Sequence, residues 1–229
     1  LSDLCISMET TGLPERLTIP HEVKLSEKAA AMYQQLEKTM LLPFADGDVD
    51  AATAAILTNK LLQLAGGAVY DENGKAQIVH DQKLEVLDQL IEEANGQPVL
   101  VFYNYKHELD RLQARYPQAV HVKEENVVKR WNAKEIPILL ANPASAGHGL
   151  NLQFGGHIAI WYSPTWNLEF FQQANKRLHR RGQAETVLIH TLSAKGTIDE
   201  RIYDIVLRNK EAGQNALLEA VKARIKEVT

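Results

Sequence analysis

The sequence predicts an α/β fold in which a mostly parallel sheet lies between two layers of helices. Five short apolar segments are typical of buried strands, and they span residues 98–103, 119–122, 136–141, 157–162 and 187–192. Segments of helical pattern separate them, which is the order of βαβ units. Ligands of open parallel sheets bind beyond the carboxyl ends of the strands, so we expect functional residues in the loops that follow these segments.

Helices are expected between these strands. Asp81 can cap a helix that continues to about Ala94, with four apolar side chains facing inward: Leu84, Leu87, Leu90 and Ile91. Further helices are predicted over residues 106–116, 125–134 and 167–181, and Gly182 is a stop signal for the last of these. The pattern Thr197-Ile198-Asp199-Glu200 resembles a capping box that opens another helix, and a final helix is predicted from about residue 213 to 228.

The first eighty residues follow a different pattern. Residues 1–25 show no clear periodicity and contain Pro14 and Pro20, so we predict a connector. Two helices are expected next, over residues 27–41 and 51–64, followed by a hairpin that turns at Asn73-Gly74. We therefore divide the chain into a connector with a helical and hairpin insertion, residues 1–80, and the lobe that contains the sheet, residues 81–229.

Composition limits the function classes. The 229 residues are 45% hydrophobic and 24% charged, as in ordinary globular proteins, and the formal net charge is −4. The single cysteine, Cys5, excludes a disulfide framework and fits a reducing, cytoplasmic setting. No apolar run reaches the roughly 18 residues of a membrane span. The acidic balance argues against a free-standing module that binds DNA tightly. The chain begins without methionine, which indicates a fragment of a longer protein.

The segment 172–183 concentrates positive charge, with four cationic side chains and no acidic residue among twelve. On a helix, Gln173, Arg177 and Arg180 would share one face, because they lie four and three residues apart. Arginine offers a planar fork of donors that keeps its charge, so such a row suits a polyphosphate. The alternative is a solvated basic face at a helix carboxyl end, where cations are favoured in any protein.

Two loops after predicted strands carry groups suited to phosphate. In the segment 142–153, Gly147 and Gly149 allow close approach of the backbone to a ligand, and Asn142 and Ser145 offer neutral hydrogen bonds of the kind used on a DNA backbone. His148 has no metal-ligand partners at suitable spacing, so we interpret it as a loop histidine and predict no metal site. The other loop is the polar run 104–106, which could equally be an ordinary helix start.

These segments resemble motifs of superfamily II helicases. The order Gln173, Arg177, Arg180, continued to Gly182-Gln183, is similar to motif VI in the Swi/Snf-type DNA translocases. Gly147, Gly149, Asn151 and Leu152 are similar to motif V, and residues 99–106 to motif IV. The chain is thus identified as a C-terminal RecA-like lobe, with a motif V wording close to that of phage and prophage helicases. Pro143, Leu168 and Lys176 depart from the usual pattern.

The resemblance implies roles for individual residues. Arg177 and Arg180 would be catalytic arginine fingers that reach the γ-phosphate of ATP. The nucleotide-binding set would be Gly147, Gly149, Asn151, Gln173, Arg177 and Arg180. The set that contacts DNA, expected to be duplex, would be Asn104, Lys106, Asn142, Ser145 and Trp166. For Trp166, a packing role is the alternative to base stacking.

Two parts of such a motor are missing from this sequence. It contains no phosphate-binding loop of the form Gly-x-x-x-x-Gly-Lys-Ser/Thr, and no Asp-Glu pair after an apolar strand. We therefore expect ATP and Mg²⁺ to be held mainly by an N-terminal RecA-like lobe of the same polypeptide, and this chain to be inactive alone. The alternatives are a non-catalytic module of the same fold that binds nucleic acid or docks a partner, and half of a two-lobed glycosyltransferase.

Overall fold

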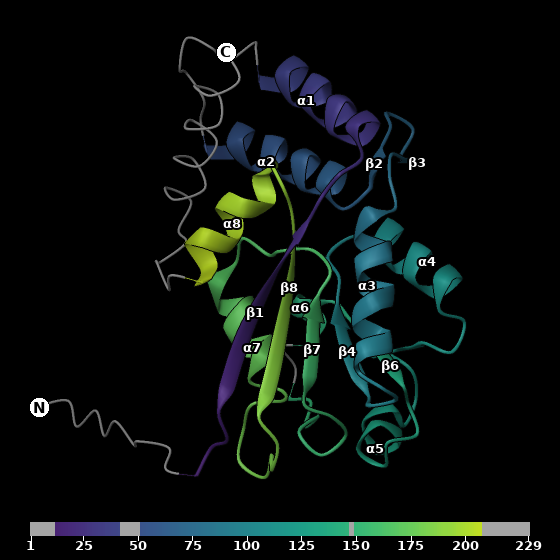
Figure 1. Cartoon of the computed structure of the whole chain (residues 1–229), viewed down its shortest axis with the longest axis vertical. Coiled ribbons are helices and arrows are strands. Elements are labelled where there is room, and N and C mark those ends of the chain that lie inside the picture. The colour runs from purple at the N-terminus through teal and green to yellow at the C-terminus, as the bar shows by residue number, and fades with distance from the viewer. Residues whose placement is uncertain (1–11, 42–50, 147–148, 208–229) are drawn as a thin grey trace, which may run out of the picture.

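The computed structural model describes residues 12–41, 51–146 and 149–207. Its centre is a six-stranded sheet in the order β1-β8-β7-β4-β6-β5, and every pair of neighbouring strands is parallel (Figure 1). The strands are β1 (Arg16–Val23), β4 (Val99–Phe102), β5 (Val120–His121), β6 (Ile138–Ala141), β7 (Ile158–Trp161) and β8 (Val187–Ala194). The prediction of a parallel α/β sheet is confirmed, and five of the six strands fall where the sequence placed them.

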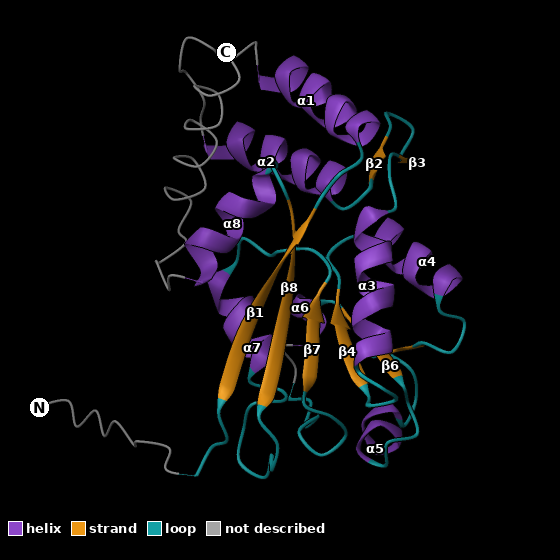
Figure 2. Cartoon of the chain, viewed as in Figure 1, coloured by secondary structure: helices purple, strands orange, loops and turns teal. Residues whose placement is uncertain are grey.

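Helices cover both faces of the sheet, which gives the three layers of a RecA-like lobe (Figure 2). The helices are α1 (Glu27–Leu41), α2 (Ala51–Ala65), α3 (Gln82–Glu93), α4 (Lys106–Arg115), α5 (Val127–Asn132), α6 (Pro143–Ala146), α7 (Leu168–Asn175) and α8 (Ile198–Leu207). Val99 and Val101 of β4 pack toward α3 and α4. Leu100 and Phe102 pack toward α2, α5, α7 and α8. Successive side chains of a strand point to opposite faces, so β4 is apolar throughout because both faces are covered.

Residues 16–23 form a strand, so the prediction of a connector there was wrong. Leu17, Ile19 and Val23 occupy alternate positions, which is the period of a strand, but Pro20 concealed the pattern. β1 lies at the edge of the sheet and pairs only with β8 over its whole length. An edge strand uses its backbone hydrogen bonds on one side only, and for this reason it tolerates a proline.

The predicted helices and hairpin of the first eighty residues are confirmed. The hairpin strands β2 (Ala68–Tyr70) and β3 (Ala76–Ile78) form a separate two-stranded sheet. Tyr33 of α1 and Leu61 of α2 are buried in the same apolar cluster as Leu100 of the central sheet. This segment therefore adds both an edge strand and core to the lobe, and a functional division at residue 80 stays a prediction.

Helix α7 ends at Asn175, six residues before the predicted end. The following residues, 176–181, are here named the arginine turn, and they close tighter turns in which Arg177 N–H donates to Ala174 and Leu178 N–H to Asn175. Tertiary contacts impose this change. The Trp161 indole donates to the Asn175 side chain over 3.0 Å, and Leu178 is buried. Gly182, with a φ of 94°, ends the turns in the left-handed region that favours glycine.

Two predicted caps use their side chains differently. Asp81 makes no capping hydrogen bond to α3, and its carboxylate instead accepts from Arg111 over 2.7 Å. At the start of α8, the Thr197 hydroxyl accepts from the Asp199 backbone over 3.3 Å and donates to the Ala194 carbonyl over 2.7 Å. Both helix starts are right, but the Asp81 side chain binds Arg111 in place of the predicted cap, and the Thr197 hydroxyl also bonds back to the end of β8. The final predicted helix, 213–228, lies outside the described residues.

Candidate functional site

The predicted site residues divide between two ends of the sheet. Five of them follow the carboxyl ends of central strands: Asn104, Lys106, Asn142, Ser145 and Trp166. The arginine turn instead lies between the end of α7 and the start of β8, after the chain has returned to the end of the sheet where β8 begins. Arg177 and Arg180 thus lie near Arg16, the first residue of β1. The residues predicted to contact DNA therefore lie at the carboxyl ends of the strands, whereas the two arginines lie near the start of β1. Gly147 lies outside the described residues.

At the carboxyl ends, two asparagines tie the loops together. The Asn104 amide donates to the carbonyls of Ser163, over 3.3 Å, and Pro164, over 2.6 Å. The Asn142 amide donates to the Asn104 carbonyl over 3.1 Å. The loops after β4, β6 and β7 are therefore linked by side-chain donors that point inward. The Ser145 hydroxyl is also engaged locally, because it donates to the Asn142 carbonyl over 2.9 Å.

Two side chains of this end face solvent. Lys106 is exposed at the first position of α4. Trp166 is 45% exposed after β7, so it is not the fully packed anchor that its residue type favours. A cation and an aromatic ring on a surface of ordered loops are suited to contact the phosphates and bases of a nucleic acid.

A buried carboxylate that the sequence analysis missed supports these loops. Glu108 accepts from the backbone N–H groups of Asn104, over 2.8 Å, and Tyr105, over 3.2 Å. The Ser163 hydroxyl donates to its other oxygen over 2.5 Å. Burial raises the pKa of Glu108, and the hydrogen bond from Ser163 offsets part of the rise. Its burial within an otherwise polar helix was not visible in the sequence.

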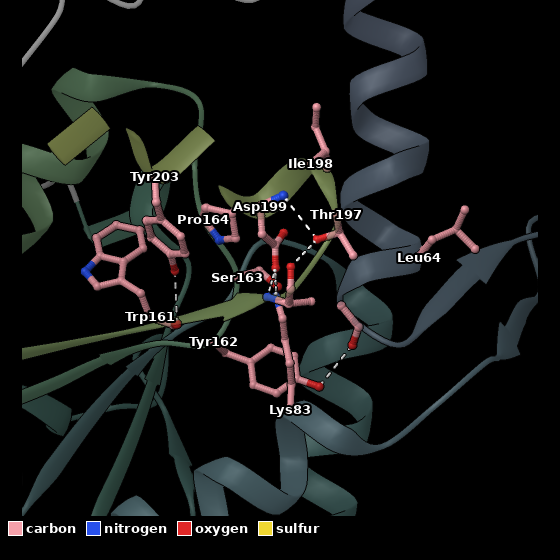
Figure 3. A network of polar contacts seen from close by, with 12 residues as sticks. Leu64, Lys83, Trp161, Tyr162, Ser163, Pro164, Thr197, Ile198, Asp199 and Tyr203 are labelled. Atoms are coloured by element: carbon pink, nitrogen blue, oxygen red, sulfur yellow. Dashed lines mark hydrogen bonds and ion pairs between the residues drawn. The ribbon is translucent and has the colours of Figure 1, made fainter. Parts of the chain in front are cut away.

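An ion pair continues this polar interior (Figure 3). Lys83, near the start of α3, lies 2.5 Å from Asp199, near the start of α8, and both side chains are fully buried. Asp199 also accepts from the Ala194 backbone over 3.0 Å. The positive charge of Lys83 reaches Glu108, where it acts to lower the pKa. We call Lys83, Glu108, Ser163 and Asp199 the buried polar network.

The arginine turn is held against the second half of the segment 142–153. The Arg180 guanidinium donates to the side-chain oxygen of Asn151, and the Leu152 N–H donates to the Arg177 carbonyl over 3.3 Å. The Asn132 side-chain amide of α5 donates to the backbone carbonyl of Asn151 over 2.8 Å, which gives Asn151 a second contact. Gly149 precedes this contact with a φ of 64°. One segment therefore runs from the carboxyl-end loops to the arginines.

The arginines line an open pocket of about 580 Å³, here named the basic pocket. Its lining residues are Leu13, Arg16, Gln173, Lys176, Arg177, His179, Arg180 and Arg181. Five of these side chains are cationic and none is acidic. Burial lowers the pKa of Arg177, and the charge of Arg180 lowers it further, yet arginine keeps its proton in proteins. This collection of positive charge fits a polyphosphate.

Gln173 contributes less directly than the shared helix face predicted. Its amide donates to Glu169, one turn earlier in α7, over 2.7 Å. The pocket thus combines one face of α7 with residues of the turn beyond it. Within residues 12–41, 51–146 and 149–207, no group of three His, Cys, Asp or Glu side chains is placed to hold a metal ion. The helices of that same part of the chain include none that is long and apolar enough to cross a membrane.

A parallel sheet with a basic pocket beside it and ordered polar loops at its carboxyl end fits the RecA-like helicase lobe that the motifs resemble. The family comparison agrees, since residues 82–182 match the model described as "Helicase conserved C-terminal domain". The chain belongs to the helicase C-terminal domains, and its likeness to the solved SWI2/SNF2 structures concerns the fold.

Its relatives range from phage to eukaryotes. Protein p41 of Acyrthosiphon pisum secondary endosymbiont phage 1 is 38% identical over 235 residues, which cover 98% of this chain. The chromatin-remodeling ATPase INO80 of Mycosarcoma maydis is 32% identical over 170 residues, which cover 66% of this chain. The Sulfolobus solfataricus SWI2/SNF2 ATPase core in complex with dsDNA shares the fold, with a TM-score of 0.63 at 19% identity, over 91% of this chain and 48% of that one.

The match covers only part of each relative. This chain spans 51% of the length of the phage protein and 9% of INO80. The comparisons establish the family and the fold of the lobe. Because this chain covers only part of each relative, the activity, substrates and partners of a whole protein are matters for proposal.

Proposed function

We propose that this lobe supplies the arginine fingers of an ATP-driven DNA motor, in which the nucleotide lies between this lobe and an N-terminal RecA-like lobe. The observation that carries the proposal is the basic pocket, where three arginines of one turn meet with no acidic residue in the lining. Like charges held together raise the free energy of the folded protein, so an anionic ligand would stabilise this cluster.

Arg177 and Arg180 are the proposed catalytic residues. ATP supplies the phosphoryl group that is transferred to water, and the two guanidinium groups offset charge that develops on it. Asn151 holds Arg180 through its side chain, and this contact orients the fork of donors before the nucleotide arrives. Gly149, Asn151 and Gln173 complete the proposed nucleotide-binding set, together with Gly147. Mg²⁺ would be held by carboxylates of the N-terminal lobe.

Duplex DNA is the proposed partner at the carboxyl-end loops. Lys106 and Trp166 are exposed there and would contact the backbone and bases directly. Asn104, Asn142 and Ser145 bind other loop groups, so in addition to a contact with DNA they would keep this surface ordered. The segment 142–152 reaches both the loops and the arginine turn, which makes it the proposed link between DNA binding and hydrolysis.

The test is DNA-stimulated ATP hydrolysis by the full-length protein that carries this chain. Replacement of the finger, Arg180→Ala, is expected to lower the rate by roughly 10³-fold or more. The matched control is Arg130→Ala, a partly exposed arginine of α5 paired with Glu124, and it should keep the full rate.

The isolated chain gives a second arm, in which we expect no hydrolysis above background. If the full-length protein binds DNA but hydrolyses no ATP, the motor proposal is wrong, and a non-catalytic binding module of the same fold is the better description.

A further inference from the structure

We propose that Arg16 is a further nucleotide-binding residue, contributed by β1 and distant in sequence from the helicase motifs. Its guanidinium would contact the phosphates of the same nucleotide that Arg177 and Arg180 address. This inference rests on the proposed function, and it adds a third arginine from the edge of the sheet. Arg16 belongs to none of the helicase motifs, and it lies in the segment 1–25 that the sequence pattern predicts as a connector.

The position of Arg16 is fixed by the sheet. It is the first residue of β1, where it lies opposite Val187 in a parallel pairing that continues for eight residues. The Val187 N–H donates to the carbonyl of Glu15 over 2.9 Å, so the backbone is also held at the residue before this pair. A side chain that starts from a paired strand is presented to the pocket in a defined direction, and it loses less conformational entropy on binding than one from a free tail.

A second contact joins β1 to the arginine turn itself. The His179 imidazole forms a hydrogen bond of 2.9 Å through Nε2 with the carbonyl of Pro14. His179 lies between Arg177 and Arg180 in the turn, and Pro14 lies two residues before Arg16. The three arginines are therefore placed by one connected set of contacts, in which the strand and the turn line the same pocket.

The charge environment of Arg16 differs from that of arginines elsewhere in the lobe. Arg111, Arg115 and Arg130 each form an ion pair with a carboxylate: Asp81, Asp88 and Glu124. Arg16 is exposed and forms no ion pair within the part of the chain that the structure describes. Arg16 also lines a second pocket of about 280 Å³.

Compared with Lys176, Arg16 is the better candidate for a specific contact. Lys176 lines the same two pockets, but an ammonium group is a point charge without a fixed donor geometry. The planar guanidinium can donate two parallel hydrogen bonds to phosphate oxygens. Arg16 and the arginine turn would thus approach the polyphosphate from different elements, a strand and a turn.

The experiment measures binding of a non-hydrolysable ATP analogue, with Mg²⁺, to the full-length protein. Arg16→Ala should raise the Kd about tenfold, which corresponds to the loss of one hydrogen-bonded charge contact. Arg16→Lys should recover part of this loss, and the control Arg130→Ala should bind as the wild type does. The KM for ATP should rise in parallel, while the affinity for duplex DNA stays the same.

Two outcomes would overturn the inference. One is an unchanged Kd for the analogue in Arg16→Ala. The other is a loss of DNA affinity with nucleotide binding intact, which would make Arg16 a DNA contact. A thermal melt shows whether each variant is folded, and Arg16→Gln replaces the alanine variant if that one is not. Absence of DNA-stimulated hydrolysis in the wild type would instead count against the proposed function, and the binding assay separates the two failures.

Discussion

Charged side chains are concentrated in two regions of this lobe, which differ in burial and in the pairing of their charges. In the buried polar network, Lys83 and Asp199 are fully inaccessible and neutralise each other at 2.5 Å, and Glu108 accepts three hydrogen bonds. In the basic pocket, cations of the strand and of the arginine turn face an open hollow without an acidic lining residue. In the first region an ion pair offsets two opposite charges, whereas the second has an excess of positive charge that a ligand can neutralise.

The difference separates stability from function. Removing one member of a buried pair leaves a charge without a partner in a medium of low dielectric constant, which destabilises the fold strongly. Removing a cation from a cluster of like charges relieves repulsion and costs the fold little. The network should therefore respond to mutation in unfolding experiments, and the pocket in assays of binding and catalysis.

The largest effect is expected from Asp199→Ala. This change leaves the Lys83 ammonium buried and unpaired, and it removes the acceptor for the Ala194 N–H. We expect the free energy of unfolding to fall by about 3–5 kcal/mol, measured by denaturant unfolding of the isolated chain.

A double variant sharpens this prediction. In Lys83→Met with Asp199→Leu, no charge is left behind, so most of the lost stability should return. A loss below about 1 kcal/mol in Asp199→Ala would mean that the ammonium finds water or another partner, and the contrast between the two regions would then be broken.

A smaller, pH-dependent effect is expected from Glu108→Gln. Burial raises the pKa of this carboxyl above 4.5, so its favourable contribution to folding is complete below the unfolded pKa and is lost as the pH rises through the folded value. Glutamine keeps an acceptor for the two backbone N–H groups without the charge. The variant should therefore gain stability relative to the wild type as the pH rises above the unfolded pKa. A difference in unfolding free energy that is constant with pH would contradict this sign.

The smallest effect is expected from Lys106→Ala, because Lys106 is an exposed cation on the surface proposed for DNA. The variant should bind duplex DNA slightly less tightly for every sequence, and the slope of log K against log salt should fall by about 1. Titrations at several salt concentrations measure this. An unchanged slope would exclude a direct contact of Lys106 with a phosphate.

Much of the fold was predictable because its strands are unambiguous. β4 and β6 are buried on both faces and are therefore apolar without interruption, and loops of suitable length separate them from helices. β1 was missed because an edge strand needs only partial burial, and Pro20 looks like a breaker when the neighbouring strand is unknown. The end of α7 was missed because the contact of Trp161 with Asn175 joins distant segments.

The site was predictable where residue order carries the signal. Arg177 and Arg180 stand at a characteristic spacing, and the pocket that they line is consistent with it. Glu108 and Lys83 gave no such signal, since nothing local distinguishes a buried charged residue of a helix from an exposed one. Arg16 joins the pocket only through strand pairing across more than a hundred and fifty residues, and a pattern along the chain does not report on such pairings.

The most direct test of the central claim is to measure both properties on one variant, Arg180→Ala of the full-length protein. The account predicts that DNA-stimulated ATP hydrolysis falls by roughly 10³-fold while the unfolding free energy stays within about 1 kcal/mol of the wild type. Retained hydrolysis with a large loss of stability would contradict it, because Arg180 would then serve the fold, as Asp199 does, and not a nucleotide.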